Sequence, residues 1–218
     1  MKDSIEVAWD MRLADITPYG GITVMLPAAV VIGGWLWFSR SRQSALLWGA
    51  VLLFVYAIVG ASKILFKGWG IGLESLNIAV ISGHAMNTSL VLPVAISLLA
   101  RQVDPRLRWP GAGVGLLIAW WFSINCVAPY IHPLQEAIAG ALLGSVAACG
   151  FLYCLENTDI KKIPHAALVI GLVFIALNTT TKKYTAEQVL NRIAVSISGA
   201  ETAFKRPEWR APVDTTKL

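Results

Sequence analysis

A histidine and a glutamate four residues apart form the first feature of this sequence that could support chemistry. They are His132 and Glu136. Residues at positions i and i+4 lie on the same face of a helix, so the carboxylate can accept a hydrogen bond from an imidazole N–H. A carboxylate in this position fixes the tautomer of the histidine and leaves its other ring nitrogen nucleophilic or basic. We therefore consider His132 a candidate nucleophile.

A second histidine lies in a short segment suited to binding an anion. Ser82, Gly83 and His84 open an apolar stretch that is predicted to be helical. Glycine permits close approach of the backbone, and the free amides at a helix start attract negative charge. Lys63 adds a positive charge, and Lys67 follows four residues later on the same helical face. Two histidines beside such an anion site indicate phosphoryl transfer, in which one attacks phosphorus and the other protonates the leaving oxygen.

Each of these residues has an ordinary structural explanation when it is taken alone. A histidine at a membrane boundary is most often a packing residue, a lysine extends to the headgroups, and a glutamate favours a helix N-terminus. His165, which has no polar partner nearby in the sequence, is interpreted as such a structural residue. The combination of Lys63 with two histidines and Glu136 instead favours a functional site.

The elements that must position these side chains are apolar helices. The 218-residue chain is 56% hydrophobic and 14% charged, and its mean hydropathy is +0.62. Six runs of at least 19 residues contain no Asp, Glu, Lys or Arg, namely 16–39, 43–62, 75–100, 109–135, 137–155 and 163–181. About 20 mostly apolar residues cross the ~30 Å hydrocarbon core of a bilayer as a helix. We therefore predict an all-α membrane protein and exclude a soluble enzyme.

The charge-free runs predict a bundle of six transmembrane helices within residues 22–180. The expected spans are about 22–38, 45–66, 77–100, 111–128, 135–155 and 164–180. Residues 1–21 are expected to form an interfacial segment, because apolar residues recur there at helical spacing opposite acidic ones. Residues 181–218 are expected to form a second amphipathic helix, over 184–198, followed by a tail.

The distribution of Lys and Arg between short loops predicts the orientation of the bundle. With six spans, both termini lie on one face, and the loops of the opposite face contain Arg40, Arg42, Arg101, Arg106, Arg108, Lys161 and Lys162. Basic loops are enriched on the cytoplasmic side of membranes. Both termini are therefore expected to face outward. The same count of spans places Lys63, His84, His132 and Glu136 near the outward boundary of the membrane.

Charge and cysteine content exclude other classes of protein. The net charge of +5 comes from loops and the tail, so we expect no nucleic-acid partner. Cys126, Cys149 and Cys154 are odd in number and lack the paired spacing of a zinc module or a disulfide framework. Acidic residues near the N-terminus replace the basic region of a cleavable signal peptide, so the first span is expected to remain. We predict no metal and no other cofactor.

At these residues the sequence resembles the type-2 phosphatidic acid phosphatase superfamily of membrane lipid phosphatases. Three motifs characterise that family, namely K-x6-R-P, P-S-G-H and S-R-x5-H-x3-D. The second resembles Ile81-Ser82-Gly83-His84. The third resembles Asn125-Cys126, five residues, His132, three residues and Glu136, followed by the small residues Ala139, Gly140 and Gly144. Lys63 alone matches the first motif, and the resemblance covers about residues 60–145.

The resemblance implies an activity and a role for each site residue. His132 would be the nucleophile, Glu136 its orienting carboxylate and His84 the general acid. The phosphate would be held by Lys63, Ser82 and Gly83. The family acts without a metal on lipid phosphates or diphosphates, such as an isoprenoid diphosphate, a phospholipid or a lipid A phosphate. Bacterial members commonly work on the outer side of the inner membrane, so the active site and both termini are expected to be periplasmic.

The chain departs from the family pattern at both motif arginines. Their positions hold Gly70 and Cys126, and Asn125 replaces the motif serine. An arginine that holds a transferring phosphoryl group contributes strongly to catalysis, so its loss needs compensation. The candidates for that role are Lys67, Arg192, Arg206 and Arg210.

Three further functions stay open beside a phosphatase. The same phosphohistidine could serve a phosphotransferase with an acceptor other than water. A chain without the motif arginines could also be a partner subunit that binds lipid phosphate and has no activity. A transporter with a histidine relay is disfavoured, because the ionisable residues cluster at one interface rather than along a path through the midplane.

Overall fold

The computed structural model describes residues 13–39, 41–156, 158, 160, 162–179 and 186–206, and most of them are helical. The longer helices are α2 (Ile22–Phe38), α3 (Arg42–Trp69), α4 (Gly83–Val103), α5 (Arg108–Phe122), α6 (Leu134–Cys154), α7 (His165–Thr179) and α8 (Ala186–Ser198). Short helical segments are η1 (Thr17–Gly20), η2 (Glu74–Leu76), η3 (Pro105–Leu107) and the π-helical η4 (Ser123–Val127). Within the described ranges there is no β-strand, so the prediction of an all-α protein is confirmed.

Four helical segments are long and apolar enough to cross a membrane. They are α3, α4, Pro105–Val127, which contains α5, and α6. A fifth span results if Leu13–Gly20 and α2, which meet at a bend of 48°, act together. Helix α7 is apolar but has only 15 residues. The described part of the chain thus has four or five candidate spans, where the sequence predicted six.

The third predicted span differs from the structure at its start. Helix α4 begins at Gly83, whereas the sequence predicted a helix from residue 77. Asn77 adopts the left-handed conformation with φ 56°. The backbone amides of residues 79–82 donate hydrogen bonds to α3 and α6. This segment is apolar because it is packed between helices, and apolar composition alone does not distinguish such a loop from a helix.

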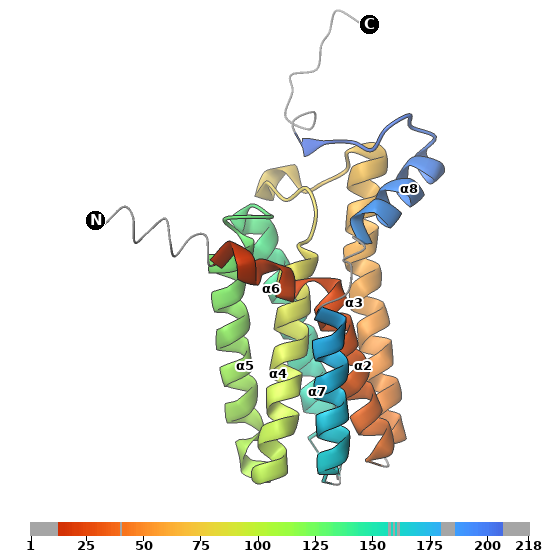
Figure 1. Cartoon of the computed structure of the whole chain (residues 1–218). Helices are drawn as coiled ribbons and strands as arrows, with labels where there is room; N and C mark the ends of the chain where they lie inside the picture. Colours follow the sequence, from red (N-terminus) through yellow and green to blue (C-terminus); the bar gives the residue numbers. More distant parts are fainter. Residues whose placement is uncertain are drawn as a thin grey trace, which may run out of the picture.

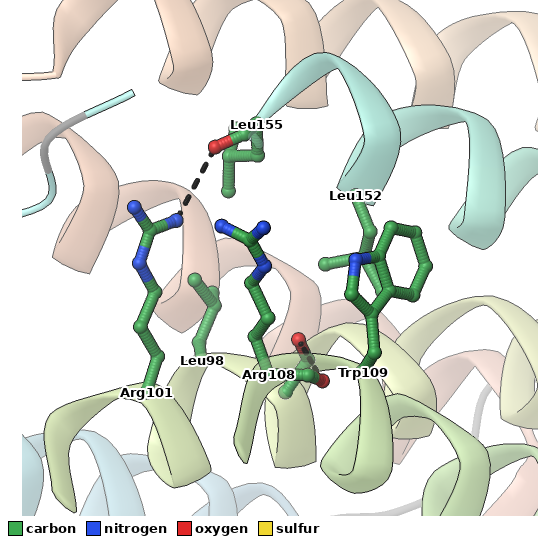
Figure 2. Close-up of a pocket in the computed structure, with 7 residues that line it drawn as sticks. Leu98, Arg101, Arg108, Trp109, Leu152 and Leu155 are labelled. Carbon is green, nitrogen blue, oxygen red and sulfur yellow. Dashed lines mark hydrogen bonds between the residues drawn. The ribbon is translucent and has the colours of Figure 1, made fainter. Parts of the chain in front are cut away.

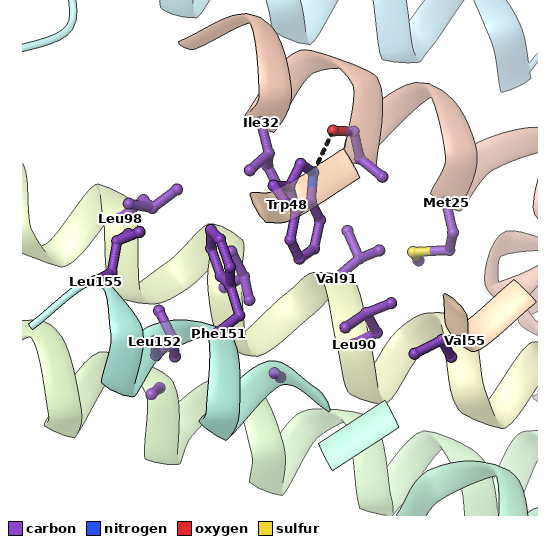
Figure 3. Packing of buried hydrophobic residues seen from close by; sticks show 14 of the residues in the cluster. Met25, Ile32, Trp48, Val55, Leu90, Val91, Leu98, Phe151, Leu152 and Leu155 are labelled. Carbon is purple, nitrogen blue, oxygen red and sulfur yellow. Dashed lines mark hydrogen bonds between the residues drawn. The ribbon is translucent and has the colours of Figure 1, made fainter. Parts of the chain in front are cut away.

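Helix α4 is the central helix of the bundle. It lies between α5 and α6, and α2 packs against it as well as against α3 and α7 (Figure 1). The core on this side contains Trp48, whose indole N–H donates to the Ala29 carbonyl at 2.8 Å. The centroid of its ring lies 4.9 Å from the centroid of the Phe151 ring, which is also drawn in Figure 3. Aromatic packing and a satisfied indole donor therefore join α2, α3 and α6.

Small residues let α4 and α6 approach closely. A Cβ atom on Gly140 would lie 2.3 Å from the Ser82 carbonyl oxygen, and one on Gly144 would lie 2.4 Å from that of Met86. Both contacts are with backbone atoms, which cannot swing aside as a side chain would. Close backbone packing at small residues is typical of helices that associate in a membrane. It places the first turn of α6 directly against the start of α4.

The opposite end of the bundle contains two arginines that cap helix α6. Arg101 donates to the Leu155 carbonyl at 3.2 Å and also to that of Thr158 (Figure 2). Arg108 donates to the carbonyl and the carboxylate of Glu156. Cations at a helix C-terminus satisfy its unpaired carbonyls and its dipole. The two arginines line a small pocket together with Ser97, Leu98, Trp109, Leu152 and Leu155. We attribute the arginines of this pocket to capping of α6 and not to a binding site.

Candidate active site

The centre of the candidate site is Glu136, in the first turn of α6. Its side chain is fully buried. Its Oε1 atom accepts hydrogen bonds from the backbone amides of Ala79 at 2.9 Å and Val80 at 3.1 Å. Backbone N–H groups of the loop before α4 thus donate to one oxygen of the buried carboxylate. A buried carboxylate requires partners of this kind, because an isolated charge in an apolar interior is very costly.

His132 contacts the other oxygen of the same carboxylate. Its Nδ1 atom lies 2.9 Å from Oε2 of Glu136, as the spacing of the two residues predicted. An ionised carboxylate can only accept, so Nδ1 carries the hydrogen and a neutral ring keeps its lone pair on Nε2. The imidazole is 11% exposed. The structure therefore brings His132 and Glu136 together in the contact that the sequence predicted.

A fourth partner of the Glu136 carboxylate comes from the end of the described chain. The Nη2 atom of Arg206 donates to Oε1 at 2.6 Å, which pairs two residues 70 positions apart. The buried carboxylate is thereby neutralised by a guanidinium. Arg206 is one of the tail arginines that the sequence offered as compensation for the missing motif arginines.

An aromatic anchor holds the segment that carries Arg206. The backbone amide of Phe204 donates to the Lys67 carbonyl at 2.8 Å. The Phe204 ring packs edge-on against Phe66, with 5.7 Å between centroids. It also covers Gly70, where a Cβ atom would lie 2.9 Å from the ring. The tail segment is therefore docked at the end of α3 by both a hydrogen bond and an apolar contact.

Ser82 and Gly83 stand at the junction of α4 and α6. The backbone amide of Ser82 donates to the Glu136 carbonyl at 3.2 Å. Its hydroxyl caps α4 by accepting from the Ala85 amide at 3.4 Å. The helix start expected at Ser82-Gly83-His84 is thus confirmed and lies beside the His132–Glu136 pair, although the predicted span began earlier, at residue 77. Gly83 is the first residue of α4.

His84 lies on the same helix end but is directed at a different neighbour. Its Nε2 atom is 3.3 Å from the place that a Cβ atom on Gly21 would take, at the start of α2. Within the described residues, no hydrogen bond links this imidazole to that of His132. The structure thus brings His132, Glu136 and Ser82 together and places His84 two residues beyond Ser82, facing Gly21.

The two lysines lie near the C-terminal end of α3 and interact with α8. Lys67 Nζ lies 3.0 Å from Oε1 of Glu187, so its charge is directed at α8. Lys63 lies within electrostatic range of both Glu187 and Glu136. Burial raises the pKa of the Glu187 carboxyl, but the Lys67 hydrogen bond and the charges of both lysines outweigh it, so the pKa lies below its usual value. Helix α8 is thereby tied to the same end of the bundle as the site (Figure 1).

The motif positions that lack arginine are filled in two different ways. Gly70 ends α3 with φ 68° and is covered by Phe204. Cys126 is fully buried in the π-helix, and its carbonyl accepts from the Thr17 hydroxyl at 2.7 Å. Asn125 donates to the Trp121 carbonyl at 2.8 Å on its own helix. None of these three positions contributes a cation to the site.

Sequence reasoning missed the residues that pack the tail onto the site. Phe204 and Glu187 gave no signal, because a lone aromatic or acid in a polar tail has no periodic partner. The amides of Ala79 and Val80 were missed because that segment was expected to be helical. Among the described residues, no group of three or more His, Cys, Asp or Glu could hold a metal ion.

Comparison with known proteins gives one relative. The chain is similar to a Klebsiella pneumoniae protein described as an uncharacterized 22.5 kDa protein in cps region. The two are 28% identical over 199 residues, which cover 88% of this chain and 95% of the relative. No protein-family profile matches the chain, and no solved structure matches it. The relative's description names no activity, so function is argued from the geometry of the site.

Proposed function

We propose that this protein is an integral membrane phosphatase that hydrolyses lipid phosphates or diphosphates through a phosphohistidine at His132. The observation that carries the proposal is the 2.9 Å contact between His132 Nδ1 and the buried carboxylate of Glu136. It supports a histidine whose Nε2 lone pair is available for attack. The substrate class is that of the resembling family, an isoprenoid diphosphate or the phosphate of a phospholipid or of lipid A.

The reaction has two steps. In the first, the Nε2 lone pair of His132 attacks phosphorus and the bond to the leaving oxygen breaks. The resemblance assigns protonation of that oxygen to His84, whose side chain faces Gly21 in the structure and has to turn toward the substrate for this step. In the second, water attacks phosphorus and the bond from phosphorus to His132 Nε2 breaks, so that inorganic phosphate leaves and the proton of the water passes to His84. Glu136 stabilises the positive charge that develops on the His132 ring. No cofactor takes part in this scheme.

Binding of the phosphate is assigned to the start of α4 and to Lys63. The amides at a helix N-terminus favour an anion, and Ser82 caps this one beside Glu136. Lys63 supplies a positive charge from α3. The resemblance of Ser82-Gly83-His84 to the second family motif supports the same assignment.

The proposed topology has six spans, with α2 and α7 added to the four long apolar segments. Both termini and the site then share the face opposite the basic loops. Helix α8 has apolar residues on one side, including Val189, Ile193 and Ile197, and is proposed to lie in the interface. A relative from Klebsiella pneumoniae supports a bacterial membrane, and the orientation makes the outward face periplasmic.

A second candidate function is a lipid-phosphate-binding subunit without hydrolytic activity. The observation that favours it is the filling of both motif arginine positions by Gly70 and the buried Cys126. A phosphotransferase is the third, because an acceptor alcohol or phosphate could replace water in the second step.

The proposal is tested with purified protein in detergent and EDTA. The wild type is expected to release phosphate from at least one member of a panel of isoprenoid diphosphates, phosphatidic acid and lipid A. His132→Ala is expected to abolish release, and His165→Ala, at the start of α7, serves as the matched control. Phosphate trapped on His132 without release to water would favour transfer. A wild type that binds these lipids and hydrolyses none would contradict the phosphatase and favour the binding subunit.

A further inference from the structure

We propose that Arg206 of the C-terminal segment is a substrate-contacting residue, with one guanidinium arm on Glu136 and the other on the phosphoryl oxygens of the substrate. The inference deepens the proposed function and rests on it. It assigns to the C-terminal segment an arginine contact with phosphate, which neither of the two motif arginine positions, 70 and 126, supplies.

The two terminal nitrogen atoms of the Arg206 guanidinium have different hydrogen-bond surroundings. Nη2 donates to Glu136 Oε1 at 2.6 Å. Nη1 is also buried, but among the described residues no acceptor lies within hydrogen-bond distance of it. The side chain as a whole is 33% exposed, so it lies at the edge of the site, and a phosphate has to displace neighbouring groups to reach Nη1. A buried donor without an acceptor is unfavourable, and a planar guanidinium is suited to binding a phosphate with the hydrogens it has left.

The shared carboxylate places this arginine next to the nucleophile. Oε1 of Glu136 accepts from Arg206, while Oε2 contacts His132 Nδ1. The guanidinium and the imidazole are thus held at the two oxygens of one buried group. This shared carboxylate is the geometric basis for assigning a contact with the phosphoryl group to Arg206 as well as to His132.

The position of Arg206 is fixed by the residues that precede it. Phe204 binds the Lys67 carbonyl through its amide and packs on Phe66 through its ring. A side chain at position 70 would collide with that ring, so Gly70 makes room for the tail. Glycine at position 70 thus allows the C-terminal segment to dock, and the docked segment brings Arg206 to Glu136.

Two other basic residues described at this end do not fit the role, and Arg210 lies outside the described residues. Lys67 is paired with Glu187 at 3.0 Å. Arg192 is exposed on α8. Arg206, by contrast, contacts the carboxylate of Glu136, which is also the partner of His132. Arg192 is therefore a matched arginine of the C-terminal segment for a control.

The first experiment compares turnover of Arg206→Ala, Arg206→Lys and Arg192→Ala with the wild type on the lipid that it hydrolyses. Loss of one strong donor to the reacting group lowers kcat/KM about 100-fold. We expect that loss for Arg206→Ala, a smaller one for Arg206→Lys, and none for Arg192→Ala. Millimolar guanidinium is expected to restore part of the activity of Arg206→Ala by occupying the place beside Glu136, and the phosphate-binding experiment below separates a substrate contact from a purely structural role. Unchanged turnover, or a loss without guanidinium rescue, would overturn the inference.

The second experiment measures inorganic phosphate binding by calorimetry and does not require turnover. Wild type is expected to bind phosphate at least ten times more tightly than Arg206→Ala, and Phe204→Ala, which releases the anchor, is expected to resemble Arg206→Ala. Equal binding by wild type and Arg206→Ala, or no binding by either, overturns the role of Arg206. If the wild type hydrolyses no lipid but binds phosphate at least ten times more tightly than Arg206→Ala, the proposed hydrolysis is wrong and the role of Arg206 in phosphate binding stands.

Discussion

A single carboxylate organises the candidate site. Glu136 holds His132 on one oxygen and Arg206 on the other, and its own backbone carbonyl accepts from Ser82. The pair with His132 could be predicted, because the spacing i, i+4 places two side chains together in any helix turn. The pair with Arg206 could not, because contact across 70 positions depends on how the tail docks.

Removal of the negative charge from Glu136 should disable the nucleophile while keeping its shape. In Glu136→Gln the amide can still accept from the Ala79 and Val80 amides through its oxygen. Its NH₂ group then faces His132 Nδ1 and favours the tautomer with the hydrogen on Nε2. We expect turnover to fall about 10⁴-fold, the effect of a wrong tautomer in a related catalytic arrangement.

Steady-state hydrolysis of a lipid phosphate measures this effect, and Glu187→Gln on α8 is the matched control because it makes the same change outside the nucleophile pair. Activity of Glu136→Gln within tenfold of wild type would mean that the carboxylate does not orient the nucleophile.

At the scale of the helices, apolar runs predicted most elements but not the loop that forms the site. Helices α2 and α6 lie within one residue of the predicted spans, since long apolar runs have few alternatives in a membrane. The segment before α4 was assigned to a helix because it is as apolar as its neighbours. Its conformation depends on hydrogen bonds to Glu136 and Ser62, which a local pattern does not contain.

The contact between α4 and α6 should be sensitive to a single methyl group. In Gly140→Ala the new Cβ atom would meet the Ser82 carbonyl oxygen at 2.3 Å, so the helices must separate. Overpacking of this kind costs about 1–3 kcal/mol. The separation also lengthens the hydrogen bond from Ser82 to Glu136, so we expect turnover to fall at least tenfold together with stability.

Gly150→Ala on the same helix is the control, because nothing lies within 4 Å of its Cβ position. Unfolding by a denaturing detergent measures stability, and hydrolysis measures the site. If Gly140→Ala keeps both at wild-type values, the close approach of α4 and α6 does not position the site.

For the whole molecule, the end of the bundle that holds Glu136 is opposite the end that holds the capping arginines. The loop between α3 and α4, the start of α6 and helix α8 lie at the first end, and η3 lies at the second (Figure 1). The short loops at the second end are basic, and the proposed orientation, which follows the positive-inside rule, has this end in the cytoplasm. A lipid headgroup at the site would then come from the outer leaflet.

This orientation is tested by labelling single cysteines with a membrane-impermeant maleimide in intact bacteria, in a background without native cysteines. Glu74→Cys in η2 and Glu201→Cys after α8 should react in intact cells, whereas Arg106→Cys in η3 and Lys162→Cys before α7 should react only after the membrane is opened. All four positions are exposed in the fold, so differences in reaction report the side of the membrane. Reaction of Lys162→Cys and Glu201→Cys from the same side would mean that α7 does not cross. Reaction of Arg106→Cys and Lys162→Cys, but not of Glu74→Cys, in intact cells would reverse the orientation and place the site toward the cytoplasm.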